Sequence, residues 1–185
     1  MYNWWIDLSG FSVVRRDRTD RRGGGVCVYI RDNISLIISC AASWFGRSST
    51  WIFMVIVETS SSTSWYEFTI LGAIYHPPGN DDSVLLNHIT ESLDGVLCSH
   101  PNAGIIIAGD FNQFKHGHLC NLFNLKQTVK HPTRGNNILD KVFTNISKFH
   151  WQHFIDQWQS LDYYGNQVSH FEKTIRMVSK KFRRI

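Results

Sequence analysis

The feature that most limits the fold is the segment Gly104–Asp110, GIIIAGD, in which three consecutive isoleucines stand between glycines. A short run of β-branched residues without polar alternation is typical of a strand that is buried on both faces. The segment before it predicts an amphipathic helix, which begins near the N-capping side chains of 81–83 and ends near Ser99. The apolar positions of this helix, spaced by three and four, are Val84, Leu85, Ile89, Leu93, Val96 and Leu97.

Five further segments have the composition of strands. Two of them are separated by the Ser/Thr-rich stretch 60–64, so we expect this pair to form an antiparallel hairpin. Several strands, then a helix, then a buried strand indicate an α/β layered fold with mixed sheets. The five segments are 24–30, 35–39, with a turn at 31–33 between them, 51–57 and 66–75, which make the hairpin, and 137–145.

The composition is that of one folded domain. The chain has 185 residues, of which 43% are hydrophobic, with 12 Phe and 7 Trp to fill a core. The net charge of +4 permits contact with a polyanion without requiring it. Much of this excess lies in the stretches 15–22 and 173–184. No apolar run approaches the length of a membrane span, and no motif for a small-molecule cofactor is evident, so we expect neither partner.

The four cysteines point to a reducing compartment. Cys27, Cys40, Cys98 and Cys120 show no short paired spacing of the kind that binds zinc. We interpret them as reduced thiols, which predicts an intracellular protein of the nucleus or the cytoplasm.

Polar residues follow the isoleucine strand where it ends. If the extended conformation continues, Asp110 and Asn112 project to one side and Phe111 projects to the other, into packing. The alternative is that Asp and Asn only end the strand, because both residue types form turns by bonding to their own backbone. Another strand ends at Tyr75, and functional sites gather at strand ends in layered α/β folds.

Four motifs occur in a fixed order: RRGGGV at 21–26, IYHPPG at 74–79, GDFN at 109–112 and HPTRGNNILDKVFTN at 131–145. In this order the chain resembles the endonuclease/exonuclease/phosphatase superfamily, and more closely the apurinic-type endonuclease domain of non-LTR (LINE-like) retrotransposons. The resemblance covers residues 10–145 and leaves 146–185 as a divergent C-terminal segment. It implies a four-layer sandwich, two mixed β-sheets flanked by helices, and Mg²⁺-dependent hydrolysis of a phosphodiester in DNA.

The resemblance also implies a role for five residues. Asp110 matches the Asp that handles a proton at the attacking water or the leaving group. Asn112 matches the Asn that hydrogen-bonds the phosphate, and Tyr75 matches the tyrosine whose hydroxyl reaches the phosphate region. Thr133 matches a threonine that supports the site, and Asp140 matches the Asp that orients a catalytic histidine. We expect these five side chains to converge on one cleft at a common edge of the two sheets.

The chain departs from the family pattern at both ends. The family carries an Asn and a metal-binding Glu on strands that precede the segment matching 10–16, where this chain has only MYNWWIDLS. The family closes with Ser-Asp-His, where this chain has Val168-Ser169-His170. The resemblance therefore implies an incomplete fold, truncated at both ends, and an endonuclease fragment that is inactive as it stands. The metal ligands are unknown, and we expect no carboxylate other than Asp110 and Asp140 near the metal position.

Two other classes of function remain open. One is a non-catalytic nucleic-acid binder that uses the arginines of 15–22 and the tryptophans. The other is a phosphoesterase of the same superfamily that acts on small phosphorylated lipids or sugars. The motifs YHPPG and HPTRGNNILD favour the retrotransposon branch over the latter.

Overall fold

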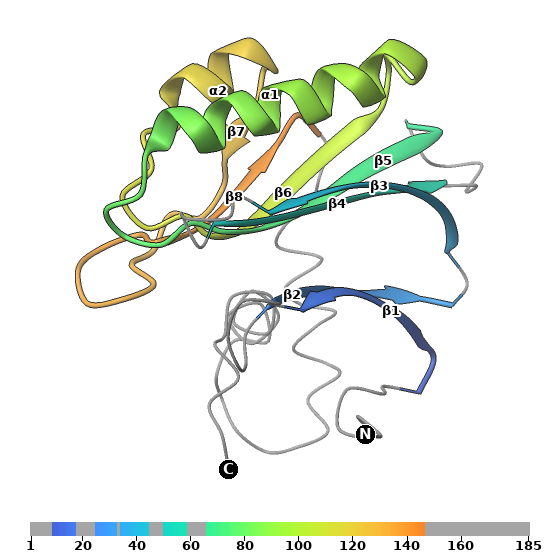
Figure 1. Cartoon of the computed structure of the whole chain (residues 1–185), viewed down its shortest axis with the longest axis horizontal. Helices are drawn as coiled ribbons and strands as arrows, with labels where there is room; N and C mark the ends of the chain where they lie inside the picture. The colour runs from blue at the N-terminus through green and yellow to red at the C-terminus, as the bar shows by residue number, and fades with distance from the viewer. Residues whose placement is uncertain (1–8, 18–24, 33, 45–49, 59–65, 147–185) are drawn as a thin grey trace.

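The computed structural model describes residues 9–17, 25–32, 34–44, 50–58 and 66–146 (Figure 1). Within these residues the chain forms two open β-sheets and two helices. The predicted α/β class with two sheets is therefore confirmed. Three segments named above have side chains that lie outside the described residues: the arginine run 15–22, the segment 168–170 and the divergent segment beyond residue 146.

The smaller sheet pairs two antiparallel strands, and the larger sheet has six strands in the order β3-β4-β5-β6-β8-β7. Only the β5–β6 pair of the larger sheet is parallel, so this sheet is mixed, whereas the described part of the smaller sheet is purely antiparallel. The strands of the smaller sheet are β1 (Phe11–Asp17) and β2 (Gly25–Arg31). Those of the larger sheet are β3 (Ser35–Trp44), β4 (Trp51–Glu58), β5 (Phe68–Tyr75), β6 (Gly104–Asp110), β7 (Lys126–Gln127) and β8 (Asp140–Thr144).

The predicted hairpin is confirmed, because β4 and β5 pair antiparallel from Trp51–Tyr75 to Glu58–Phe68. The expected turn at 31–33 lies between β2, which ends at Arg31, and β3, which begins at Ser35. These two strands belong to different sheets, since β2 pairs with β1 and β3 pairs with β4. The strand predicted at 137–145 is shorter in the structure, because residues 134–137 form a tight bridge before β8 begins.

Helix α1 (Asp82–Ser99) makes the crossover between the parallel strands β5 and β6. It begins as predicted: a carboxylate oxygen of Asp81, the N-cap, accepts hydrogen bonds from the amide and the hydroxyl of Ser83. Leu85 and Ile89 are fully buried, but Val84 is 38% exposed, so its assignment to the apolar face was wrong. The short helix α2 (Gly117–Leu122) follows β6.

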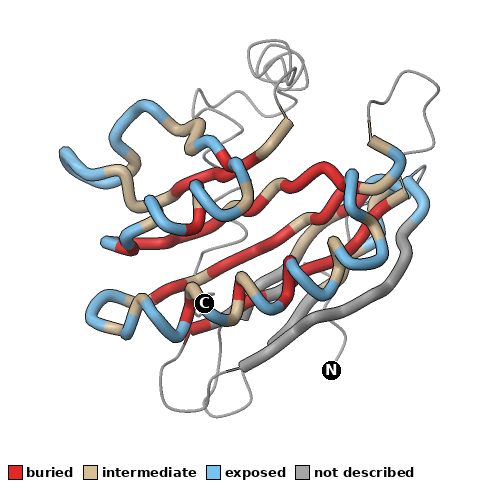
Figure 2. The backbone as a smooth tube through the Cα atoms, turned by 90° about the horizontal axis from the view of Figure 1, so that it is seen from above, coloured by how far each residue is buried: buried red, intermediate tan, exposed pale blue. Residues whose placement is uncertain are grey.

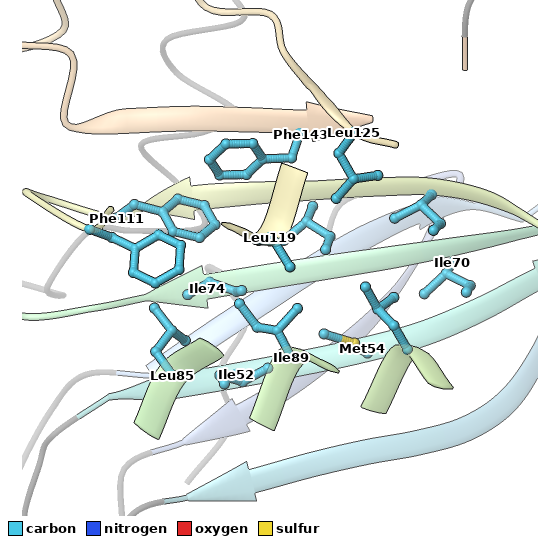
Figure 3. Packing of buried hydrophobic residues seen from close by; sticks show 14 of the residues in the cluster. Ile52, Met54, Ile70, Ile74, Leu85, Ile89, Phe111, Leu119, Leu125 and Phe143 are labelled. Carbon is cyan, nitrogen blue, oxygen red and sulfur yellow. The ribbon is translucent and has the colours of Figure 1, made fainter. Parts of the chain in front are cut away.

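The larger sheet is covered on both faces. Helices α1 and α2 lie over one face, and β1–β2 lie over the other (Figure 1). Burial is concentrated along the central strands and along the side of α1 that faces them (Figure 2). On the helix side, residues such as Ile74, Leu85 and Phe143 form the main core (Figure 3). On the other side, Ile30 of β2 packs with Val55, Val57 and Ala73.

No helix in the described part of the chain is long and apolar enough to cross a membrane.

Candidate functional site

Three of the predicted residues lie side by side at one end of the six-stranded sheet. Tyr75 at the end of β5 pairs with Asp110 at the end of β6, and Asp110 pairs with Asp140 at the start of β8. Direct partners on neighbouring strands present their side chains to the same face. Tyr75 packs beside the cluster of Ile30 and Val55. The three residues therefore share the face of the sheet that is turned toward β1–β2 and away from the helices.

Gly109 allows this arrangement. Its φ is +156°, and a Cβ built on it would overlap the carbonyl oxygen of Ile74 on β5. Only glycine tolerates so close an approach of two backbones. The requirement for glycine in GDFN is therefore structural: it lets the end of β6 lie against the end of β5, which brings Asp110 beside Tyr75.

Asp110 is a buried carboxylate with only 5% of its surface exposed. Burial is the main cause that raises the pKa of Asp110, and the neighbouring charge of Asp140 raises it further. Three groups oppose this shift: the amide of Asn112, which donates to Oδ1 at 3.2 Å, and the charges of Arg134 and Lys141. A carboxyl group whose pKa is raised in this way is better suited to exchange a proton near neutral pH.

Asn112 does not continue the strand, so the expectation that it shares a face with Asp110 along an extended chain was wrong. Its φ is +49°, in the left-handed region that Asn tolerates better than most residues. Its amide donates to Asp110, which is the turn-forming alternative. Its side chain is 4% exposed, and Nδ2 donates to the carbonyl oxygen of His76 at 2.7 Å. Phe111 is fully buried in the helix-side core, as expected.

Thr133 supports Asp140 through the backbone. Its hydroxyl oxygen accepts hydrogen bonds from the amides of Leu139 and Asp140, both at 3.0 Å. The loop that enters β8 is thereby fixed at its base. The role that the resemblance implies for Thr133 at a catalytic site stays a prediction.

Lys141 is a site residue that the sequence reasoning missed. It is 6% exposed, and its Nζ donates to the carbonyl oxygens of Asn112 at 2.7 Å and Phe114 at 3.4 Å. Burial lowers the pKa of Lys141, while the charges of Asp82 and Asp110 act in the opposite direction. The available signal was a lysine directly before the apolar pair Val142-Phe143 of the strand DKVFT. Lys141 holds the turn that follows Asp110 from the helix side of the sheet.

A second missed group surrounds His76, which is 2% exposed. Its Nε2 lies 3.0 Å from Oδ1 of Asp82, and its Nδ1 lies 3.3 Å from the hydroxyl of Thr50. The other carboxylate oxygen of Asp82 accepts the amide of Lys115 at 2.9 Å. The backbone amide of His76 also donates to the carbonyl oxygen of Asp110 at 2.8 Å. This network joins the end of β5, the start of α1 and the turn after β6.

The structure thus brings Tyr75, Asp110 and Asp140 together at one end of the sheet. The convergence of all five side chains on one cleft at a common edge of the two sheets stays a prediction. The described residues show two carboxylates there and contain no group of three or more His, Cys, Asp or Glu that could hold a metal ion. Glu58 and Glu67 lie toward the opposite end, where β4 ends and β5 begins. The Asn and the Asp of the N-terminal stretch MYNWWIDLS, Asn3 and Asp7, lie outside the described residues, as does His170.

Three comparisons with known proteins, against family models, curated proteins and solved structures, found no match. The fold and the site therefore define the chain as an α/β protein in which a buried carboxylate, Asp110, and a half-buried one, Asp140, lie side by side at the end of a mixed sheet.

Proposed function

We propose that this chain is a fragment of a retrotransposon-type, divalent-metal-dependent DNA endonuclease that hydrolyses phosphodiesters, and that it is inactive as it stands. The observation that carries the proposal is the register of three strand ends. Tyr75, Asp110 and Asp140 are consecutive neighbours across β5, β6 and β8 and share one face. These are three of the five residues that the four sequence motifs assign to phosphodiester hydrolysis.

The chemistry of the side chains fits this reaction. Asp110, whose pKa is raised by burial and by Asp140, is suited to take or give a proton at the attacking water or the leaving group. The hydroxyl of Tyr75, on the same face, would donate to the phosphate as charge develops on its oxygens. Asn112 contributes by position as well, because its side chain ties the turn after β6 to the end of β5.

The residues also fit a hard cation in part. Mg²⁺ is bound in proteins by one or two carboxylates together with substrate phosphates. Asp110 and Asp140 would supply those oxygens, and the bound ion would neutralise charge on the phosphate and activate water. The metal-binding Glu of the family has no counterpart among these two carboxylates, so the site would be incomplete. Loss of members of a catalytic unit is strongly non-additive, which is the reason that we expect nicking to be weak or absent.

The order of the layers supports the four-layer sandwich that the resemblance implies. Helices, a six-stranded sheet and a two-stranded sheet follow one another across the described residues (Figure 1). We infer that these are three layers of a four-layer sandwich.

A binding experiment tests the site without requiring turnover. Affinity for a short labelled DNA duplex is measured by fluorescence anisotropy for the wild type, Asp110→Asn and Asp140→Asn, with EDTA and then with Mg²⁺. Without metal, each substitution should strengthen binding because it removes a charge that repels phosphate. With Mg²⁺, the wild type should gain affinity and the two variants should gain much less. The matched control is Asp94→Asn, an exposed acid on α1 with the same change of charge.

The outcomes separate the classes of function. If Asp110→Asn and Asp140→Asn behave like Asp94→Asn, the strand ends are not a DNA site and the proposal is wrong. Binding without a response to Mg²⁺ would indicate the non-catalytic nucleic-acid binder. Absence of duplex binding combined with phosphate release from small phosphorylated lipids or sugars would indicate the phosphoesterase. Mg²⁺-dependent nicking of supercoiled plasmid that disappears in Asp110→Asn would support the endonuclease and contradict its inactivity.

A further inference from the structure

The loop that precedes β8 carries Arg134 in a braced position. The amide of Arg134 donates to the carbonyl oxygen of Asn137 at 3.1 Å, and the amide of Asn137 donates back to Arg134 at 3.0 Å. Gly135, at the tip of this turn, has a φ of +57°, which favours glycine. The hydroxyl of Thr133 holds the base of the loop. The backbone that presents Arg134 is therefore fixed, although the loop itself is exposed.

The Arg134 side chain reaches back toward the buried carboxylate. Its Nη2 lies 3.9 Å from Oδ2 of Asp110, and the Arg134 side chain is 68% exposed whereas that of Asp110 is 8% exposed. A distance of 3.9 Å is too long for a hydrogen bond, so the pair is held by charge alone. Such a pair with one exposed partner contributes little to stability, and an incoming anion can replace it at small cost.

A phosphate can bind beside the two carboxylates of the site only if a cation offsets their charge. Asp110 and Asp140 lie directly opposite each other, and two carboxylates repel a phosphate. Lys141 points from the other face of β8 and is occupied with two carbonyl oxygens. Arg134 approaches Asp110 from the solvent side, and a guanidinium has five donors in a planar fork that matches two oxygens of a phosphate.

We propose that Arg134 binds a backbone phosphate of the DNA strand at the Asp110–Asp140 pair, and that its contact with Asp110 is its resting position in the free protein. This inference rests on the proposed function. The guanidinium would leave Asp110 when the phosphate arrives, so one group both neutralises the carboxylate in the free chain and recognises the substrate. Because every nucleotide carries the same phosphate, the contact should add affinity without sequence preference.

The test is the salt dependence of binding to two duplexes of unrelated sequence. The logarithm of the affinity is plotted against the logarithm of the salt concentration for the wild type, Arg134→Gln and Arg134→Lys. Loss of one phosphate contact should reduce the magnitude of the slope by about 0.9 in Arg134→Gln, equally for both duplexes. Arg134→Lys should keep the slope but recover only part of the affinity, because an ammonium cannot bind two oxygens as a fork does. Lys130→Gln is the matched control, an exposed lysine shortly before the same loop.

Each result decides a different point. Thermal melts that coincide with the wild type would show that Arg134→Gln keeps its fold, so that a reduced slope reports a lost contact. A wild type that binds with the Mg²⁺ response described above, together with an unchanged slope in Arg134→Gln, overturns the role of Arg134 alone. An equal reduction in Lys130→Gln also overturns it, because diffuse surface charge would then suffice. A wild type that binds neither duplex overturns this inference together with the proposed function.

Discussion

At the scale of single residues, the candidate site depends on two kinds of position. At Gly109 no larger side chain fits, and at Asp110 and Lys141 an ionisable group is buried, which costs free energy when the group is charged. All three lie within two adjacent strands, β6 and β8. Strain and buried charge of this kind persist where the surrounding structure holds them in place.

We expect Gly109→Ala to destabilise the protein by about 3 kcal/mol or more, because the new methyl group would overlap the carbonyl oxygen of Ile74 and the positive φ disfavours alanine. Urea unfolding measures this change. Gly95→Ala is the control with the opposite sign, since Gly95 lies within α1 with open space around it and alanine should stabilise the helix by about 1 kcal/mol. Equal effects of the two substitutions would contradict the close approach of β6 and β5.

Asp110→Asn should raise the stability at neutral pH by about 1 kcal/mol, although it removes a proposed functional group. The pKa of Asp110 is raised in the folded state above its ordinary value of 3.8, chiefly by burial and then by Asp140. Below that ordinary value both states carry the proton. As the pH rises past it, the unfolded state releases the proton first, so the wild type loses stability until the folded-state pKa has also been passed.

The difference in the free energy of unfolding between Asp110→Asn and the wild type should therefore grow from about pH 4 upward and then level off. Urea unfolding at a series of pH values measures it. Asp94→Asn provides the baseline for the same chemical change at an exposed position. A difference that shrinks over this range would mean that the folded state favours the ionised carboxylate, contrary to the burial of Asp110.

At the scale of elements, Asp82 connects three of them. It belongs to the first turn of α1, and its two oxygens contact His76 after β5 and the amide of Lys115 after β6. The two contacts bring together residues that are 6 and 33 positions apart in the chain. The helix start is thus fixed to the same strand ends that carry Tyr75 and Asp110.

Asp82→Ala should destabilise the chain by about 2 kcal/mol, because it leaves the buried His76 ring and the Lys115 amide without this acceptor. Hydrogen exchange should show the largest loss of protection at the Lys115 amide. Asp94→Ala, on the exposed side of the same helix, should change little. Uniform loss of protection along α1 in both variants would point to a general helix effect and away from this network.

Sequence reasoning identified the elements whose signals are local. The isoleucine run predicts β6, the Asp81 cap predicts the start of α1, and the loop 60–64 predicts the β4–β5 hairpin. Strand ends also predicted where Tyr75, Asp110 and Asp140 gather. The length of β3 and the choice of sheet for β2 were not predictable, because pairing partners decide them.

The supporting contacts of the site escaped prediction for the same physical reason. Lys141 and Asn112 are 29 positions apart, and His76 and Asn112 are 36 apart. Nothing in the local pattern of a lysine in a strand or a histidine before two prolines shows which carbonyl or carboxylate it meets. The turn at Asn112 was foreseeable as an alternative, since Asn tolerates a positive φ, but extension and turn were equally compatible with the letters GDFN.

At the scale of the whole molecule, the question is whether the two sheets form one cooperative unit. The smaller sheet touches the larger one through Ile30, which is 3% exposed and packs with Val55, Val57 and Ala73. The site residue Tyr75 borders the same cluster. The face that carries Tyr75, Asp110 and Asp140 is therefore also the face on which the smaller sheet rests.

We expect Ile30→Ala to destabilise the protein by about 3 kcal/mol, the usual cost of such a cavity in a packed core. If the sheets share one core, the loss must appear in both of them, because opening of either exposes the same buried surface. Hydrogen exchange should then show similar losses of protection in β2 and in β5. Ile34→Ala, the same change at a residue that is 37% exposed, should cost well under 1 kcal/mol. A loss confined to β1 and β2 would mean that the smaller sheet opens independently, and the face bearing Asp110 would then be uncovered without unfolding of the six-stranded sheet.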